Sequence, residues 1–107
     1  MTEIAQLSLD LAGGSDKVSV RLLAPERLED GPGWRCKFEI GEPIDYARYI
    51  YGETSFQALV LALKILSVEL YCSDEYKEGR LGIDGEFHGY LGLPASKEVL
   101  DRAPYPF

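Results

Sequence analysis

The chain has few of the residues that most often carry metal, redox or nucleophilic chemistry. Its 107 residues include one histidine and two cysteines. Two cysteines are too few for a disulfide scaffold, so we expect Cys36 and Cys72 to be reduced thiols in a cytoplasmic protein. Zinc normally takes three or four protein ligands, and a chain with a single histidine gives such a site little support. We therefore expect no metal and no cofactor.

Basic residues and long apolar runs are scarce as well. The chain has 11 Lys and Arg against 18 Asp and Glu, a formal net charge of −7. Nucleic acids and anionic membranes bind dense Lys and Arg surfaces, so we expect neither as a partner. Gln57, Lys64 and Glu69 interrupt the most apolar stretch, which is too short to span a membrane. Residues 1–4 show no basic segment before an apolar one, so we expect no secretory signal.

The organisation of the chain indicates one domain over residues 1–107, without repeats or linkers. Alternation of apolar and polar residues predicts four strands, at residues 7–11, 18–22, 34–40 and 44–51. The clearest alternation, in residues 34–40, points Trp34, Cys36, Phe38 and Ile40 inward. The strand at 44–51 has no clean phase, which we interpret as a bulge or a partly covered outer face.

Residues 54–72 predict a long helix. Thr54 and Gln57 fit a capping box, in which each side chain bonds the backbone N–H of the other residue. The helical period places one apolar stripe on the core side, made of Phe56, Leu59, Leu63, Leu66 and Leu70 with Ala62 beside it. The predicted fold is therefore α+β: an antiparallel sheet of about four strands, one long helix packed on one face and an irregular C-terminal wrap.

A second apolar cluster, Leu61, Ile65 and Val68, lies on the far side of the same helix. Leaving three such side chains in water would be costly, so we expect them to be covered. One interpretation is that the C-terminal segment folds over them with Leu81, Phe87, Tyr90 and Leu93. The other is a subunit interface, to which Tyr49 and Tyr51 would also contribute.

Three stretches are similar to a known family. They are Trp34-x-Cys36-x-Phe38-x-Ile40, then Tyr51-Gly52-x-x-Ser55-x-Gln57-Ala58-Leu59-x-Leu61-Ala62-Leu63, and Gly89-Tyr90-x-Gly92-Leu93-Pro94. Together they resemble an uncharacterised family of small, single-domain bacterial proteins, over residues 18–94. The resemblance implies a bacterial cytoplasmic α+β domain, and because the family has no assigned activity it carries over no catalytic residue.

The candidates for chemistry are weak. Asp84, Glu86 and His88 alternate and would share one face of a strand, as half of a metal site. The competing interpretation is that Asp84 and Gly85 form a tight hairpin turn, which would separate the three side chains. Ser55 follows a strand-to-helix turn but lacks the second glycine of a nucleophile elbow. We expect no catalytic residue.

The sequence therefore favours a small, acidic, non-enzymatic protein-interaction module. One version is a homodimer. Another is an immunity- or antitoxin-like protein whose acidic surface neutralises a basic effector. The alternative class is a small-ligand-binding or enzymatic domain, with a pocket between the helix at 54–72, the strand at 44–51 and the C-terminal segment.

Overall fold

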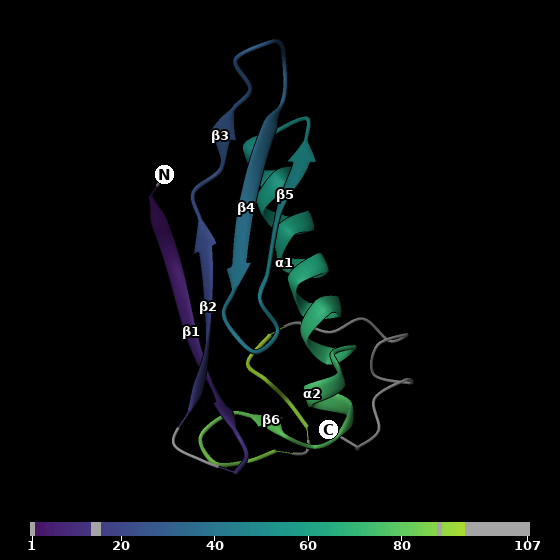
Figure 1. Ribbon diagram of the computed structural model, residues 1–107. Helices are drawn as coiled ribbons and strands as arrows, with labels where there is room; N and C mark the ends of the chain where they lie inside the picture. The colour runs from purple at the N-terminus through teal and green to yellow at the C-terminus, as the bar shows by residue number, and fades with distance from the viewer. Residues whose placement is uncertain (1, 14–15, 88, 94–107) are drawn as a thin grey trace.

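The computed structural model describes residues 2–13, 16–87 and 89–93, and it confirms the predicted α+β class. Figure 1 shows an antiparallel sheet with one main helix behind it. The elements in chain order are β1 (Glu3–Leu11), β2 (Lys17–Leu23), β3 (Glu26–Arg27), β4 (Trp34–Ile40), β5 (Tyr46–Gly52), α1 (Ser55–Tyr71), α2 (Asp74–Lys77) and β6 (Leu81–Gly82).

The sheet has six strands instead of about four, because two short strands were not predicted. β3 and β6 contain two residues each, too few to show an alternating pattern. The strand order is β3-β4-β2-β1-β6, and β5 pairs with the other edge of β4. β4 is therefore the strand on which the sheet is built, since β2 and β3 share one of its edges and β5 occupies the other.

The predicted bulge in the fourth strand is wrong. β5 runs in regular register with β4, from Trp34 opposite Gly52 to Ile40 opposite Tyr46. The strand begins at Tyr46, later than predicted, because Asp45 has a positive φ of 52° that ends the extended backbone on its N-terminal side. The other interpretation, a partly covered outer face, holds at Tyr49, whose ring is half-buried there by Arg35 and Lys37. β5 lies at the edge of the sheet, so Arg48 reaches solvent although it is in phase with buried Ile50.

The core lies between the sheet and α1. Cys36, Phe38 and Ile40 of β4 are buried, as predicted, against Leu66 and other apolar residues of the helix. α1 packs across β4 and β5. Its first half approaches the strands closely, because Ala58 and Ala62 are small. Gly52 makes the same approach possible, since a Cβ there would lie 2.6 Å from the Ala58 nitrogen.

Two hydrogen bonds were predicted for the cap of α1. One is confirmed, and the other has a different donor. The Thr54 hydroxyl accepts from the Gln57 backbone N–H at 3.0 Å, as predicted. The Gln57 side-chain oxygen, however, accepts from the backbone N–H of Glu53 at 2.6 Å instead of that of Thr54. The first bond satisfies an N–H group that the start of a helix leaves without a partner, and the second ties the residue before the cap to the first turn.

The predicted core stripe of α1 is correct in its C-terminal part and wrong at Phe56. Leu66 and Leu70 are buried, whereas Phe56 is 76% exposed. At the start of the helix the buried side is centred on Ala58 and Ala62. Phe56 precedes Ala58 by two residues, and at about 100° per residue it lies on nearly the opposite side.

The described part of the C-terminal segment packs near the end of α1. The Tyr71 hydroxyl donates to the Leu93 carbonyl at 3.1 Å and accepts from the Leu91 backbone N–H at 3.0 Å. Leu81 and Leu93, predicted to cover the far side of the helix, are buried here, but Tyr90 is 62% exposed. The rest of the predicted wrap, residues 94–107, lies outside the described residues.

The far side of α1 is only partly covered in the described structure. Leu61 and Ile65 are half-buried against the core, and Val68 is 40% exposed. No helix within residues 2–13, 16–87 and 89–93 is long and apolar enough to cross a membrane.

A pair of substitutions in α1 tests this assignment of faces. We expect Leu66→Ala to lower the free energy of unfolding by about 2–5 kcal/mol, because it leaves a cavity under the sheet. Phe56→Ala removes a larger side chain from an exposed site and should change it by less than about 1 kcal/mol. Urea unfolding followed by circular dichroism measures both. A larger loss for Phe56→Ala than for Leu66→Ala would contradict the observed orientation of α1.

Candidate functional site

The segment that contains Asp84 and Glu86, the strongest metal candidate in the sequence, forms a tight turn. Asp84 and Gly85 have positive φ values of 51° and 82° and connect Ile83 to Glu86, which pair as an antiparallel bridge. This hairpin geometry separates Asp84 from Glu86, and His88 lies outside the described residues. Across the described chain no group of three or more His, Cys, Asp or Glu side chains could hold a metal ion. The turn is tied to β1 by Asp10, which accepts from the Gly85 backbone N–H at 2.7 Å.

The remaining nucleophile candidates occupy structural positions. The Cys36 thiol is buried and donates to the Leu23 carbonyl at 3.3 Å, and burial raises its pKa, which disfavours the reactive thiolate. Cys72 caps the C-terminus of α1 and is also a free thiol. Ser55 is the first residue of α1 and is half-buried.

Two buried tyrosines join the C-terminal segment to the helices. The rings of Tyr71 and Tyr76 meet edge to face with centroids 5.2 Å apart. The Tyr76 hydroxyl donates to the Gly89 carbonyl at 3.0 Å. Burial, with a smaller contribution from Tyr71, raises the pKa of Tyr76 to about 12. Both hydroxyls are engaged with backbone groups, so we interpret the pair as structural.

The outer face of the sheet carries polar residues that are joined in cross-strand ion pairs. Arg21 bonds Glu3 at 2.6 Å and Glu39 at 2.8 Å, and Lys37 lies 3.2 Å from the second oxygen of Glu39. Arg35 bonds Glu26 at 2.5 Å. Their charges largely compensate one another on this face.

Tyr49, one of the predicted interface residues, lies on this outer face. Its ring is covered by two cations, with the Arg35 guanidinium carbon 4.3 Å and the Lys37 ammonium nitrogen 5.4 Å from the ring centroid. Tyr49 is half-buried by these contacts. It is therefore separated from Leu61, Ile65 and Val68, which belong to the helix layer.

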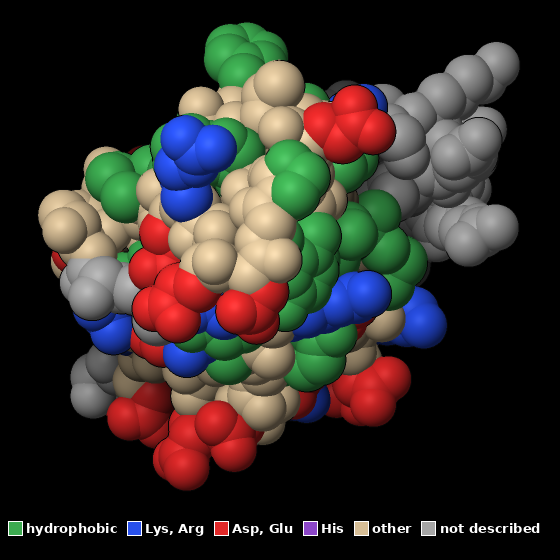
Figure 2. All heavy atoms as spheres, turned by 90° about the horizontal axis from the view of Figure 1, so that it is seen from above, with side chains coloured by type: hydrophobic (Ala, Val, Ile, Leu, Met, Phe, Trp, Pro, Cys, Tyr) green, Lys and Arg blue, Asp and Glu red, His purple; other side chains and the backbone are tan. Residues whose placement is uncertain are grey.

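An apolar groove lies at the end of the molecule where α1 begins. We call it the β5–α1 groove. It has a volume of about 740 Å³ and is lined by the β3–β4 connection, the end of β5 and the first turns of α1: Leu28, Pro32, Gly33, Tyr51, Gly52, Glu53, Gln57 and Leu61. Figure 2 looks onto this end and shows contiguous apolar side chains toward the middle and right, with acidic side chains gathered at the lower edge.

The groove brings together two of the predicted interface residues, Tyr51 and Leu61. Tyr51 is 57% exposed and Leu61 is half-buried. This groove differs from the predicted pocket between helix, strand and C-terminal segment, because the β3–β4 connection forms one of its walls and the C-terminal segment does not line it. Leu28 and Pro32 were missed because residues 26–33 have the composition of a polar loop.

β5 adds a second feature beside the groove, an unpaired strand edge. Among the described residues β5 pairs with β4 alone, so the backbone groups on its other edge have no strand partner. Arg48 of β5 is exposed and has no ion-pair partner within the described part of the chain. An exposed edge of this kind can accept another strand.

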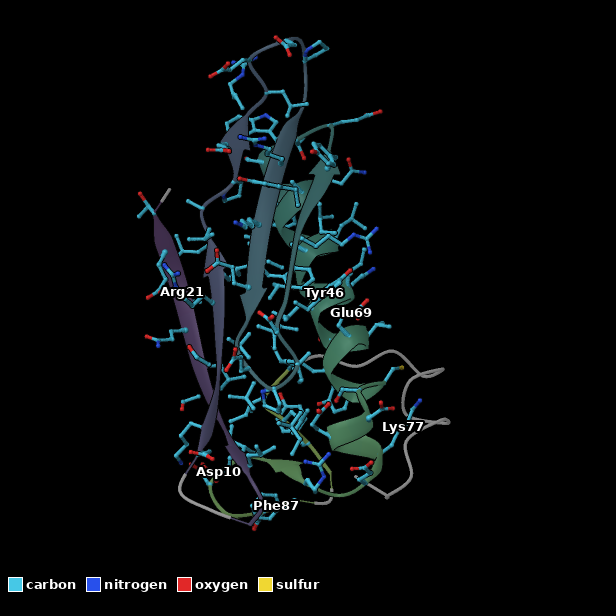
Figure 3. The ribbon with its side chains drawn as sticks, viewed as in Figure 1. Asp10, Arg21, Tyr46, Glu69, Lys77 and Phe87 are labelled. Carbon is cyan, nitrogen blue, oxygen red and sulfur yellow. The ribbon has the colours of Figure 1, made fainter. Side chains whose placement is uncertain are left out.

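A smaller cleft of about 420 Å³ lies at the other end of α1. Figure 3 shows Tyr46 and Glu69 close together here. Ile44 and Cys72 complete the less polar part of its lining, and carboxylates of α1 and α2 surround it: Glu69, Asp74 and Glu75. This cleft is acidic where the β5–α1 groove is mainly apolar.

Comparison with protein families shows which family this chain belongs to. Residues 5–95 match the model of a family described as a Domain of unknown function, DUF6968. The chain belongs to this family. The match confirms the predicted membership of an uncharacterised family, and the residues that line the β5–α1 groove all fall inside the DUF6968 match. No curated protein and no solved structure matches the chain.

The buried phenol of Tyr76 predicts a loss of stability in alkali. Its pKa is about 12 in the fold and about 10 in an unfolded chain, so its contribution is complete below pH 10 and is lost as the pH rises through 12. The unfolding free energy should fall by up to about 3 kcal/mol over this range. Tyr76→Phe should flatten the fall in urea titrations, whereas Tyr90→Phe, at an exposed position, should leave it unchanged. An equal fall in all three proteins would refute the assignment.

Proposed function

We propose that this DUF6968 protein is a protein-interaction domain that binds its partner at the β5–α1 groove. The observation that carries the proposal is an apolar hollow with Tyr51 57% exposed, directly beside a strand edge that is unpaired in the described structure. Tyrosine is enriched in protein interfaces because its ring provides apolar area and its hydroxyl a hydrogen bond. An added strand would supply main-chain hydrogen bonds, and the groove would receive its side chains.

A macromolecular partner suits the groove better than a small ligand. Small-ligand sites bury most of the ligand surface in a concave pocket with a few convergent polar groups. The β5–α1 groove is open along the strand edge and has Glu53 and Gln57 as its polar side chains. Its volume still falls within the range of ligand sites, so a small ligand is the alternative outcome of the test.

A second version of the proposal uses the acidic cleft. Glu69, Asp74 and Glu75 surround a hollow that contains Tyr46, in a chain with a formal net charge of −7. Such a surface attracts basic proteins and would suit an immunity- or antitoxin-like role against a basic effector. We propose the bacterial cytoplasm as its location, a compartment in which the free thiols Cys36 and Cys72 stay reduced.

Photo-crosslinking tests the groove as a binding site. A benzophenone amino acid at Tyr51, in cells that make the full chain, should form a covalent adduct with a protein. The purified partner should then bind the native chain, and Leu61→Asp should weaken binding by about tenfold or more, because it places a charge in the apolar groove.

The matched control is the same crosslinker at Ser19, which is exposed on the outer face of the sheet. We expect no specific adduct there. If Tyr51 gives no protein adduct, or adducts no more specific than those of Ser19, the proposed function fails. If instead a purified small molecule protects Tyr51 from reaction, the ligand-binding alternative replaces it.

A further inference from the structure

We infer that the partner binds β5 through an extended segment with a basic side chain at one end, an acidic one near its middle and apolar ones at the other end. This inference rests on the proposed function and names the chemistry of the partner. The β5–α1 groove and the acidic cleft are then the two ends of one binding surface, with the free edge of β5 between them.

β5 is the edge of the sheet that is open to pairing. On the opposite edge, β1 shifts register between Glu3 and Ala5 and pairs at one end with β6, through Asp10 and Leu11. A bulge and a covering strand both discourage the addition of another strand. β5 stays in register with β4 along its seven residues and has no other strand partner within the described residues. An extended segment would find a regular row of backbone donors and acceptors there.

The two hollows lie at opposite ends of this edge. Tyr51 and Gly52, the last residues of β5, line the β5–α1 groove. Tyr46, the first residue of β5, lines the acidic cleft. Along an extended strand, Tyr46 and Tyr51 are about 17 Å apart. A segment that pairs with all seven residues of β5 would therefore reach both hollows.

The flank of α1 between the two hollows is apolar. Leu61 lines the groove and Cys72 lines the acidic cleft. These two residues are about three turns apart, so they lie on the same flank of the helix. Ile65 and Val68 lie between them on this flank, Ile65 half-buried and Val68 40% exposed. Apolar side chains of an added strand that point toward the helix would cover these groups and remove them from water.

The acidic end of the edge lacks compensating cations. Glu69, Asp74 and Glu75 line the cleft with Tyr46, and its described lining contains no Lys or Arg. None of these three carboxylates has an ion-pair partner within the described part of the chain, in contrast to the paired carboxylates of the outer face. A Lys or Arg at the matching end of the partner would complement this charge.

Arg48 sets the opposite requirement at the middle of the edge. It follows Tyr46 by two residues, so its side chain leaves β5 on the same side, toward the helix layer, and it is exposed. A partner residue opposite Arg48 would point to that side too. An acidic side chain is favoured there and a basic one is repelled. At alternate positions the partner should therefore carry a basic, an acidic and an apolar residue, opposite Tyr46, Arg48 and Ile50.

Selection from random peptides tests this order of side chains. A displayed library of peptides of about nine residues, long enough to span β5, is selected against the full chain. Enriched peptides should share a Lys or Arg, an acidic residue two positions away and an apolar residue two positions further in the same direction. Against Arg48→Gln the acidic preference should fall to its frequency in the unselected library, while the apolar preference remains. Arg48→Lys, which keeps the charge, should retain both.

The matched control is Gln6→Glu, which makes the same change of net charge at an exposed position on β1. It should leave the selected pattern unchanged. A synthetic peptide with this pattern should bind the native chain about tenfold or more tightly than a peptide with its acidic and basic residues exchanged, because the exchange replaces two attractions by two repulsions. In Arg48→Gln this ratio should fall to about threefold or less.

Three results overturn the inference: no enrichment of any peptide, enriched peptides without this order of charges, or an acidic preference that Arg48→Gln leaves unchanged. Circular dichroism of each variant shows whether it folds. A partner that crosslinks from Tyr51 through a helix or a folded surface would leave the proposed function standing and remove only the extended segment.

Discussion

The packing of α1 on β4 is the contact on which the other features depend. Phe38 is fully buried at the centre of β4, and small residues of α1 allow the helix to approach the strands, among them Ala58 and Ala62. Gly52 serves the same approach from β5, because any side chain there would collide with the backbone of the helix. Once the helix is fixed in this way, its remaining apolar side chains must face other directions. Leu66 and Leu70 extend the buried side, while Phe56 and Val68 are left exposed.

The two layers of the protein consequently differ in what they present to a partner. The outer face of the sheet is polar, with each cation beside an acidic residue, as Arg21 is beside Glu3 and Glu39. The helix layer is apolar on more than one side, and it meets the strand edge of β5 at the β5–α1 groove. Aromatic and aliphatic side chains next to unpaired backbone groups favour protein binding over solvent. This contrast supports the proposed function.

The sequence predicted the features that depend on local pattern. The alternation in residues 34–40 located β4, and the Thr54 cap located the start of α1. Features that depend on distant neighbours were missed. The helical period placed Phe56 on the core side, but the sheet does not cover that side of the first turn of α1. β3 and β6 contain too few residues to show an alternating pattern. The β5–α1 groove shares two walls, the helix and β5, with the pocket that the sequence suggested. Its third wall, with Leu28, comes from a loop whose position only the folded β3–β4 connection determines.

Amide hydrogen exchange along β5 tests most directly whether this edge is where a partner binds. Every second backbone N–H of β5 points away from β4. In a dilute solution of the chain these amides should exchange quickly, and the β4 amides should exchange slowly. When the partner captured by crosslinking from Tyr51 is added, the outward amides of β5 should become protected while those on the edge of β1 do not. Outward β5 amides that exchange at the same rate with and without that partner would contradict the account.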